Sequence, residues 1–401
     1  MRVIGVAGQI AVALRVRRSA RLAALLAIAT LLSILTGSVA QRTGRTVAVA
    51  FELLWYFGDG PLAIQSAAPP RLEKMLVVDG QEFAVDVYDP GGFGGRAGIV
   101  LANGIEPAGR RYEPLVELAE TLARVGIVVA VPDLVSYGEY RLEPGDVGRL
   151  QESYRYLLDE IAVDPGRSGF LGFSAGGSLT VIAATDSQIA SEVGFVALVG
   201  PYSDLRRVVS FAITGAYPRG RGFTRYNTEV LVWQVTRNTI LSGLADEQER
   251  AILARIFSGT SPVPVPSVLE QYPDLALSDD GRAIYELFAN RDPGAVAGLV
   301  ARLPTASRNL LTSLSPALVA PVLAARLLLM HEGGDPYFPV YESSELVASL
   351  PGQASLISTA LLEHAVLRTP PATPSNIVGF YVPESFKLLA YIYNLLEETD
   401  G

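Results

Sequence analysis

Residues 172–177 read Gly-Phe-Ser-Ala-Gly-Gly and continue an apolar run, residues 168–173, that is typical of a short buried strand. A chain that leaves a strand and turns sharply into a helix needs small residues around the turn, and glycines lie two before and two after Ser174. This pattern predicts a nucleophile elbow, a turn that leaves the serine hydroxyl exposed. The chain contains 38 glycines, so the pentapeptide alone also fits an ordinary serine-glycine turn.

Candidates for a general base are few, because the chain has two histidines. His364 follows an apolar segment, residues 354–362, near the C-terminus, and His331 ends the apolar run 326–330. Asp335 comes just past the end of that second run, where the strands of parallel sheets carry functional groups. An imidazole can take the proton of a serine, and a carboxylate can fix the tautomer of the imidazole.

Taken in the order Ser174, Asp335 and His364, these residues resemble the nucleophile, acid and base of the α/β-hydrolase superfamily. The resemblance covers about residues 72–398, and residues 333–339 resemble the acid loop of the family. It implies a Ser-His-Asp triad that works through an acyl-enzyme intermediate and needs no cofactor.

The segment 101–105, Leu-Ala-Asn-Gly-Ile, follows a predicted strand where the family usually has His-Gly and donates an oxyanion-hole amide. Asn103 replaces the histidine, but a backbone donor does not depend on that side chain. The resemblance therefore implies an oxyanion hole formed by the backbone N–H groups of Ile105 and Ala175.

Other assignments remain open at this stage. His331 is an alternative base, although its place just ahead of the acid loop favours a structural role. Asp204 follows the predicted strand 195–199 and is an alternative acid, because some family members place the acid there, but Asp335 is favoured. The same triad also serves peptidases and amidases, and a hydrolase fold can belong to an inactive interaction protein.

The chain has 401 residues, of which 49% are hydrophobic, and its alternating strand and helix patterns predict an α/β fold with a mostly parallel twisted sheet of about eight strands flanked by helices. Residues 83–88 alternate in polarity, which predicts an antiparallel, half-exposed opening strand. Residues 126–131 are apolar throughout, as in a strand covered on both faces. The predicted strands are residues 75–78, 83–88, 98–101, 127–131, 169–173, 195–199, 326–330 and 355–361, and apolar stripes predict helices within 112–124 and 147–158.

The stretch between the sixth and seventh of these strands is too long for one crossover helix. We expect residues 203–318 to form a mainly helical cap, with helices at 228–237 and 245–257, inserted into a core of residues 72–202 and 319–401. In the family such a cap covers the active site, whereas the alternative is an insertion that never touches substrate.

The N-terminus has a different character. Residues 22–40 are 19 consecutive uncharged residues preceded by four arginines, which predicts a hydrophobic helix acting as a membrane anchor, or a signal peptide cleaved after residues 38–40. We therefore expect a segment 1–45 of this kind and a membrane-anchored or secreted enzyme whose catalytic domain is extracytoplasmic. Residues 46–71 are interpreted as a linker or interfacial helix, with an ordinary packed helix as the alternative.

Composition narrows the function further. The chain has no cysteine, which excludes a thiol nucleophile or a cysteine-based zinc site, and its two distant histidines do not suggest a metal centre. Residues 92–97 mimic a dinucleotide fingerprint but precede a strand instead of following one. A net charge of −9 argues against nucleic acid as a partner. The sequence thus predicts a membrane-associated serine hydrolase acting on a small-molecule carboxylic ester.

Overall fold

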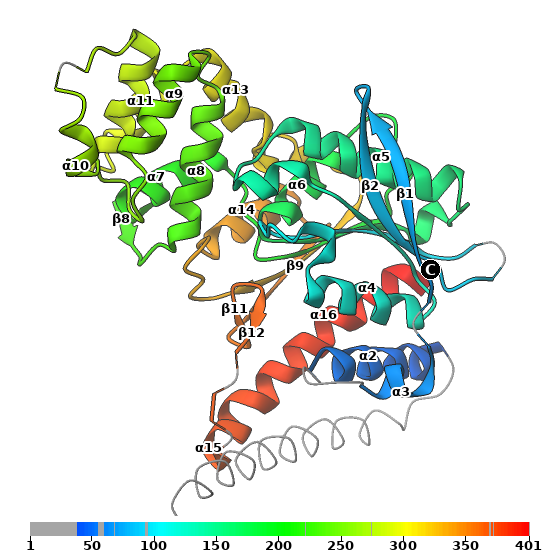
Figure 1. Ribbon diagram of the computed structural model, residues 1–401. Coiled ribbons are helices and arrows are strands. Elements are labelled where there is room, and N and C mark those ends of the chain that lie inside the picture. The colour runs from blue at the N-terminus through cyan, green and yellow to red at the C-terminus, as the bar shows by residue number, and fades with distance from the viewer. Residues whose placement is uncertain are drawn as a thin grey trace, which may run out of the picture.

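An eight-stranded sheet forms the centre of the computed structural model, which describes residues 38–54, 60–67, 69–92, 95–220, 222–273, 275–368, 370–371 and 373–400 (Figure 1). The strand order is β1-β2-β4-β3-β5-β6-β9-β10. β2 is antiparallel to β1 and to β4, and all the other neighbours are parallel. The strands are β1 Arg71–Val78, β2 Gln81–Tyr88, β3 Gly98–Ala102, β4 Val128–Pro132, β5 Gly169–Phe173, β6 Phe195–Val199, β9 Arg326–Glu332 and β10 Ala354–Thr359.

Helices cover both faces of this sheet, as the continuously apolar strands require. Along each buried strand successive side chains enter opposite cores: Val100 packs with one set of helices, while Ile99 and Leu101 pack with the other. One face carries α5 Pro144–Asp159, α6 Ser174–Ala183 and α14 Tyr341–Ser349; the other carries α2 Ser38–Leu54, α4 Glu113–Arg124 and α16 Val382–Asp400. The predicted layered α/β architecture is therefore confirmed.

The expectation of a half-exposed strand at residues 83–88 is wrong. β2 lies inside the sheet between β1 and β4, and the side chains of Asp86 and Tyr88 are fully buried. Asp86 tolerates burial because Arg110, from the loop after β3, forms an ion pair with its carboxylate. The exposed edge strand is β1, whose first five residues all face solvent.

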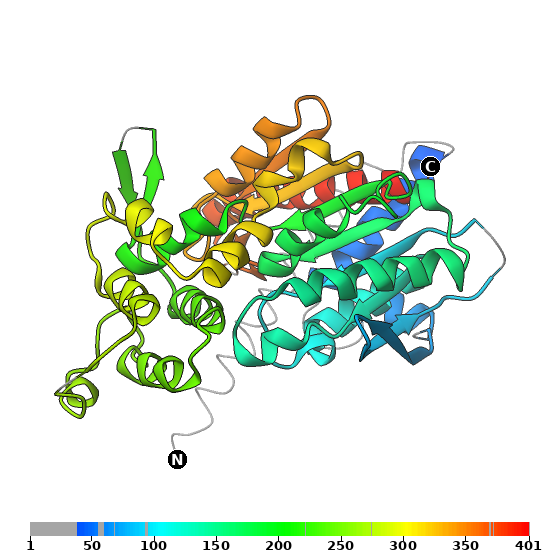
Figure 2. The same ribbon diagram turned by 90° about the horizontal axis from the view of Figure 1, so that it is seen from above.

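The chain between β6 and β9 forms a mainly helical cap at one end of the sheet (Figures 1 and 2). The helices expected within 228–237 and 245–257 correspond to α8 and α9. An aromatic cluster of Trp233, Phe257 and Phe288 gives the cap a core of its own. The cap elements are α7 Leu205–Thr214, β7 Ala216–Arg219, β8 Gly222–Arg225, α8 Val230–Ser242, α9 Glu247–Ile256, α10 Pro266–Leu269, α11 Asp279–Ala289, α12 Val296–Ala301 and α13 Thr305–Ser313.

Short elements complete the described chain. A two-stranded hairpin, β11 Leu362–Glu363 and β12 Val366–Leu367, follows β10. The others are α3 Pro61–Gln65, α15 Pro374–Asn376, a π-helical turn Ile377–Tyr381, and the 3-10 turns Gly109–Arg111, Val135–Glu139, Pro165–Arg167, Pro316–Leu318 and Ala320–Val322.

Helix α2 packs on the C-terminal helix α16 and on α4 (Figure 1). Val49 and Ala50 are buried in this contact, and Arg42 and Arg45 form ion pairs with Asp400. Residues 46–54 thus form part of a packed helix. The expected hydrophobic helix falls mostly on residues 22–37, which lie outside the described residues, and within the described ranges no helix has the length and hydropathy to cross a membrane.

Candidate active site

Ser174 occupies the turn between β5 and α6 with a left-handed backbone, φ 52°. This conformation is costly for a residue other than glycine and is found where the surrounding structure enforces it. The flanking glycines allow the close approach: a Cβ on Gly172 would lie 2.4 Å from Cα of Gly177, and a Cβ on Gly176 would lie 1.9 Å from the carbonyl oxygen of Asn103. The turn therefore has the geometry of a nucleophile elbow, and only glycine fits at these contacts.

Asp335 follows β9 and hydrogen bonds to His364: Nδ1 of the imidazole lies 2.7 Å from Oδ2 of the carboxylate. The other carboxylate oxygen, Oδ1, accepts the backbone N–H groups of Tyr337 and Phe338 at 2.7 and 3.0 Å. Burial raises the pKa of Asp335, but hydrogen bonds from His331 and His364 outweigh burial and hold the pKa well below its usual value. The side chain is therefore an ionised acceptor for the Nδ1–H of His364.

His364 occupies the two-residue turn between β11 and β12, also with a left-handed backbone, φ 58°. Its ring stacks on Tyr337, with centroids 4.3 Å apart, and meets Phe338 edge to face. Its backbone N–H donates to Oε2 of Glu332 at 2.7 Å. Three kinds of contact thus orient the imidazole.

Ser174 and His364 lie at the same edge of the sheet. Phe173 pairs with Val199, so Ser174 and Gly200 leave neighbouring parallel strands, which run about 4.8 Å apart. The imidazole packs directly over Gly200, where a Cβ would lie 3.2 Å from Nδ1. Ser174 also shares a pocket with the two aromatic residues that contact the imidazole.

That pocket lies between the elbow and the cap and contains about 390 Å³ of empty space, part of it open to solvent. Helices α7 and α8 of the cap form one wall, so the cap contributes directly to the site. None of the lining side chains carries a charge. The lining residues are Ile105, Leu142, Ser174, Ala175, Tyr202, Leu205, Val208, Leu231, Val232, Val235, Thr236, Tyr337 and Phe338.

The two residues expected to form the oxyanion hole, Ile105 and Ala175, both line this pocket beside Ser174. Gly104 packs against the elbow, where a Cβ would lie 3.1 Å from the Cβ of Ser174. Ala175 is in the first turn of α6, where backbone N–H groups have no partner within the helix. Asn103 is buried behind the loop, and neither polar atom of its side chain has a hydrogen-bond partner.

His331 lies apart from the pocket and is fully buried. Its Nε2–H donates to the carbonyl oxygen of Phe338 at 2.9 Å, and Nδ1 accepts from the hydroxyl of Ser343 at 2.6 Å. Nε2 also lies 3.4 Å from Oδ2 of Asp335. Nε2 thus holds the acid loop and Nδ1 contacts α14, which leaves neither ring nitrogen free to take a proton from a serine.

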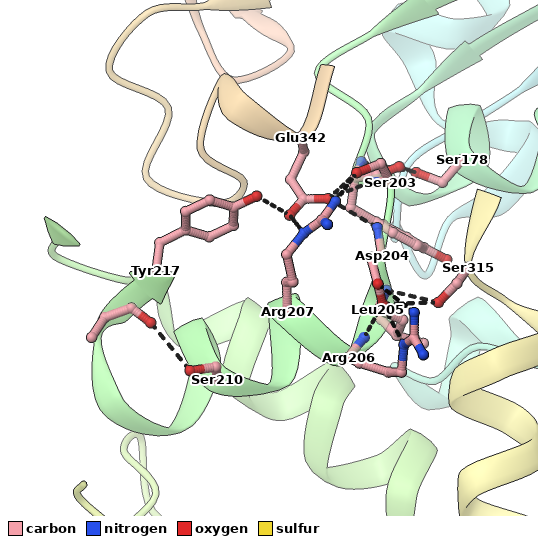
Figure 3. A network of polar contacts seen from close by, with 12 residues as sticks. Ser178, Ser203, Asp204, Leu205, Arg206, Arg207, Ser210, Tyr217, Ser315 and Glu342 are labelled. Carbon is pink, nitrogen blue, oxygen red and sulfur yellow. Dashed lines mark hydrogen bonds and ion pairs between the residues drawn. The ribbon is translucent and has the colours of Figure 1, made fainter. Parts of the chain in front are cut away.

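Asp204 caps α7, and its side chain hydrogen bonds to Arg206 and Ser315 and to neither histidine. Its carboxylate accepts the backbone N–H of Arg206 and forms a two-pronged ion pair with the guanidinium of the same residue (Figure 3). Burial raises the pKa of Asp204, but the bonds from Arg206 outweigh burial, and the pKa is lowered. The structure therefore brings Asp335, and not Asp204, to His364.

Glu342 is a buried carboxylate that sequence patterns did not single out. It lies in the first turn of α14 and joins the core to the cap (Figure 3). The carboxylate accepts the backbone N–H groups of Ser203 and Asp204, the hydroxyl of Tyr217 and the guanidinium of Arg207. These partners lie more than a hundred residues away along the chain, so no local pattern could have revealed them.

The strand order, with β2 antiparallel to both of its neighbours and the elbow after β5, decides the fold. The chain has the α/β-hydrolase fold. In the described part of the chain, no three histidine, aspartate or glutamate side chains are grouped to hold a metal ion.

No protein-family model and no curated relative matches the sequence. Among solved structures, the chain is similar to a puromycin-hydrolysing peptidase of Mycobacterium tuberculosis at 16% identity and a TM-score of 0.48, over 82% of this chain and 40% of that chain. It is also similar to a thermostable carboxylesterase cloned from a metagenomic library, at 16% identity and a TM-score of 0.45, over 84% and 92%. A Pyrobaculum calidifontis esterase shares 14% identity with a TM-score of 0.46, over 93% and 97%.

Proposed function

We propose that this protein is a serine hydrolase that cleaves a carboxylic ester through an acyl-enzyme intermediate. The observation that carries the proposal is the hydrogen-bonded pair of Asp335 and His364 beside the strained elbow of Ser174. A serine hydroxyl is a weak nucleophile at neutral pH unless a base removes its proton during attack. The imidazole is such a base, and the ionised carboxylate fixes its tautomer.

In the proposed reaction Oγ of Ser174 attacks the ester carbonyl carbon while Nε2 of His364 takes the hydroxyl proton. The negative charge on the carbonyl oxygen is stabilised by the backbone N–H groups of Ile105 and Ala175. The intermediate collapses, the C–O bond to the alcohol breaks, and the imidazolium returns its proton to the leaving oxygen. A water molecule, activated by the same imidazole, then releases the acid and restores Ser174.

The pocket supports an uncharged, apolar acyl group as the substrate portion nearest the serine. All its lining side chains are uncharged, and most are aliphatic or aromatic. A charged acyl group would lose its hydration without gaining a partner, which costs several kcal/mol.

Covalent labelling by a fluorophosphonate tests the proposal together with hydrolysis of p-nitrophenyl esters. We expect Ser174→Ala to abolish labelling and to lower turnover by about three orders of magnitude or more, because the nucleophile is gone. Ser344→Ala is the matched control, because this exposed serine lies on α14 away from the pocket. Labelling that persists in Ser174→Ala, or a wild-type protein that neither labels nor turns over, would contradict the proposal and favour an inactive interaction protein.

The leaving group is tested by a matched ester and anilide with the same acyl group. Fold and triad do not decide between them, since both reactions pass through the same acyl-enzyme. We expect the ester to be cleaved at a measurable rate that Ser174→Ala removes. Faster cleavage of the anilide, or of an aminoacyl amide, would instead assign the site to a peptidase or amidase.

We further propose that residues 22–37 hold the enzyme at a membrane with its catalytic domain on the non-cytoplasmic side, or direct its secretion. The support comes from their uncharged sequence and from the arginines at positions 15, 17, 18 and 21. The packed helix α2 then connects this segment directly to the core.

A further inference from the structure

Glu332 is the last residue of β9, and its side chain reaches the turn that carries His364. Oε2 accepts the backbone N–H of His364 at 2.7 Å, and the residue is only 6% exposed. The guanidinium of Arg368, on the far side of the β11–β12 hairpin, lies 3.8 Å from the other oxygen, Oε1. Glu332 therefore contacts both the turn of this hairpin and the residue that directly follows β12.

The hairpin cannot hold its own shape. β11 and β12 have two residues each, and an isolated hairpin even of ordinary length is marginally stable in water. His364 is at the first of the two turn positions with φ 58°, a conformation that is uncommon for residues other than glycine. Its backbone N–H bonds to no backbone carbonyl, so without Glu332 this buried donor would have no partner.

Burying the carboxylate of Glu332 costs free energy, so we ask which interaction offsets this cost. Burial raises the pKa of Glu332, the nearby charge of Asp335 raises it further, and the hydrogen bond from His364 opposes both. A charge-assisted hydrogen bond to the backbone N–H is about twice as strong as a neutral one, so the carboxylate is a suitable anchor for a turn under strain. Asp335 fixes the ring of His364, and Glu332 fixes its backbone.

We propose that Glu332 is a positioning residue, which holds the backbone of His364 in its left-handed conformation and thereby aims Nε2 at Ser174. The inference rests on the proposed function in so far as His364 is the base of a serine hydrolase. Loss of the anchor lets the imidazole sample other orientations, and misplacement of a catalytic group by about 1 Å can cost roughly a hundredfold in rate.

The test compares Glu332→Ala, Glu332→Gln and the control Glu363→Gln in the full-length protein. Glu332→Ala removes the acceptor, Glu332→Gln keeps an oxygen that can accept the N–H, and Glu363→Gln removes a neighbouring exposed charge that makes no hydrogen bond to His364. We expect kcat in Glu332→Ala to fall about 10- to 100-fold at an unchanged KM. Glu332→Gln should recover most of the rate, and Glu363→Gln should match the wild type.

A second readout does not depend on turnover. The chain has two histidines, so isotope labelling of histidine gives two sets of ring signals in NMR. We expect the hydrogen-bonded Nδ1–H signal of His364 to broaden or disappear in Glu332→Ala and to return in Glu332→Gln. The His331 signal should stay unchanged in all variants, which also shows that β9 is intact.

The outcomes separate the two proposals. If Glu332→Ala keeps both its kcat and its His364 signal, or if Glu332→Gln is as impaired as Glu332→Ala, the positioning role is overturned. If the wild type has no hydrolase activity but Glu332→Ala still loses the His364 signal, the anchor role stands and the proposed function fails.

Discussion

Nδ1 of His364 lies 2.7 Å from Oδ2 of Asp335, while Asp204, the other candidate acid, pairs with Arg206. We expect Asp335→Asn to lower kcat by about four orders of magnitude, because an amide at this place stabilises the wrong tautomer of the imidazole. Asp204→Asn should change kcat by about twofold or less, because its carboxylate faces α7. Ester hydrolysis with each variant, after circular dichroism has shown a folded protein, checks this. A larger loss in Asp204→Asn would move the acid to the end of β6.

Gly176 tests the geometry of the elbow. A Cβ at this position would lie 1.9 Å from the carbonyl oxygen of Asn103, so Gly176→Ala must push α6 away from the strand that carries the oxyanion loop. We expect loss of labelling and a fall of about 1 to 3 kcal/mol in the free energy of unfolding. The control is Gly298→Ala in α12, where a Cβ meets no atom and should stabilise the helix by up to about 1 kcal/mol. Equal stability of the two variants would contradict the close contact.

The apolar pocket predicts a size limit for the acyl group. Val235 lines the pocket from α8, and Val230 lies on the same helix but is exposed and does not line it. We expect Val235→Phe to lower kcat/KM for long acyl chains by about tenfold or more relative to the acetyl ester, because the ring fills part of the cavity. Val230→Phe should leave the acyl preference as it is. If the two variants show the same series of kcat/KM values, the acyl group binds elsewhere.

The free energy of unfolding should depend on pH through the protonation of Asp146, whose carboxyl group is buried at the start of α5. Burial raises its pKa to about 6, against hydrogen bonds from Ser136 and Arg149. Between the usual pKa near 3.8 and the raised value, the folded protein keeps a proton that the unfolded chain has lost. The free energy of unfolding therefore decreases as pH rises through this window, by at most about 3 kcal/mol.

Urea denaturation of wild type, Asp146→Asn and Asp159→Asn at about pH 4 and about pH 7 measures this contribution. We expect a smaller decrease between the two pH values in Asp146→Asn, because the group that titrates is gone. Asp159, at the exposed end of the same helix, should leave the decrease unchanged when replaced. Identical pH slopes in all three proteins would show that Asp146 titrates normally in the fold.

Local sequence patterns predicted those features that depend on residues close together in the sequence, namely the elbow and the buried strands. The elbow at Ser174 was visible because its glycines are nearest neighbours in sequence, and the buried strands were visible because both of their faces are apolar. Local patterns singled out Asp335 and His364, but their pairing was implied only by the resemblance, and the order of the strands within the sheet was not predicted.

Long-range polar contacts could not be predicted in this way. The alternation in β2 suggested a strand with one face in water. Asp86 is nevertheless buried, and its carboxylate is paired with the guanidinium of Arg110, which lies 24 residues further along the chain. Glu332 and Glu342 have the appearance of ordinary acidic residues near strand and helix ends. Their partners lie 32 and more than a hundred residues away, so only the folded chain shows that one anchors His364 and the other ties the cap to the core.

The packing of α2 determines how many N-terminal residues can be removed without loss of stability. The resemblance begins near residue 72, but α2 buries Val49 and Ala50 against α16 and α4, and its Arg42 pairs with Asp400. We expect a protein that lacks residues 1–37 to be soluble and active, because α2 remains whole. A protein that lacks residues 1–60 should unfold several degrees lower, because apolar faces of α16 and α4 become exposed.

Carbonate washing of membranes and N-terminal sequencing of the full-length protein decide the role of the segment itself. An intact N-terminus in the washed membrane fraction indicates an anchor, because a helix of 19 uncharged residues can span a hydrocarbon core of about 30 Å. A mature protein that starts at Gln41 indicates a cleaved signal, and α2 would then lose only its first three residues and keep the ion pair of Arg42. A full-length protein with an intact N-terminus that stays in the cytosol would contradict both versions and assign residues 22–37 to packing within the protein.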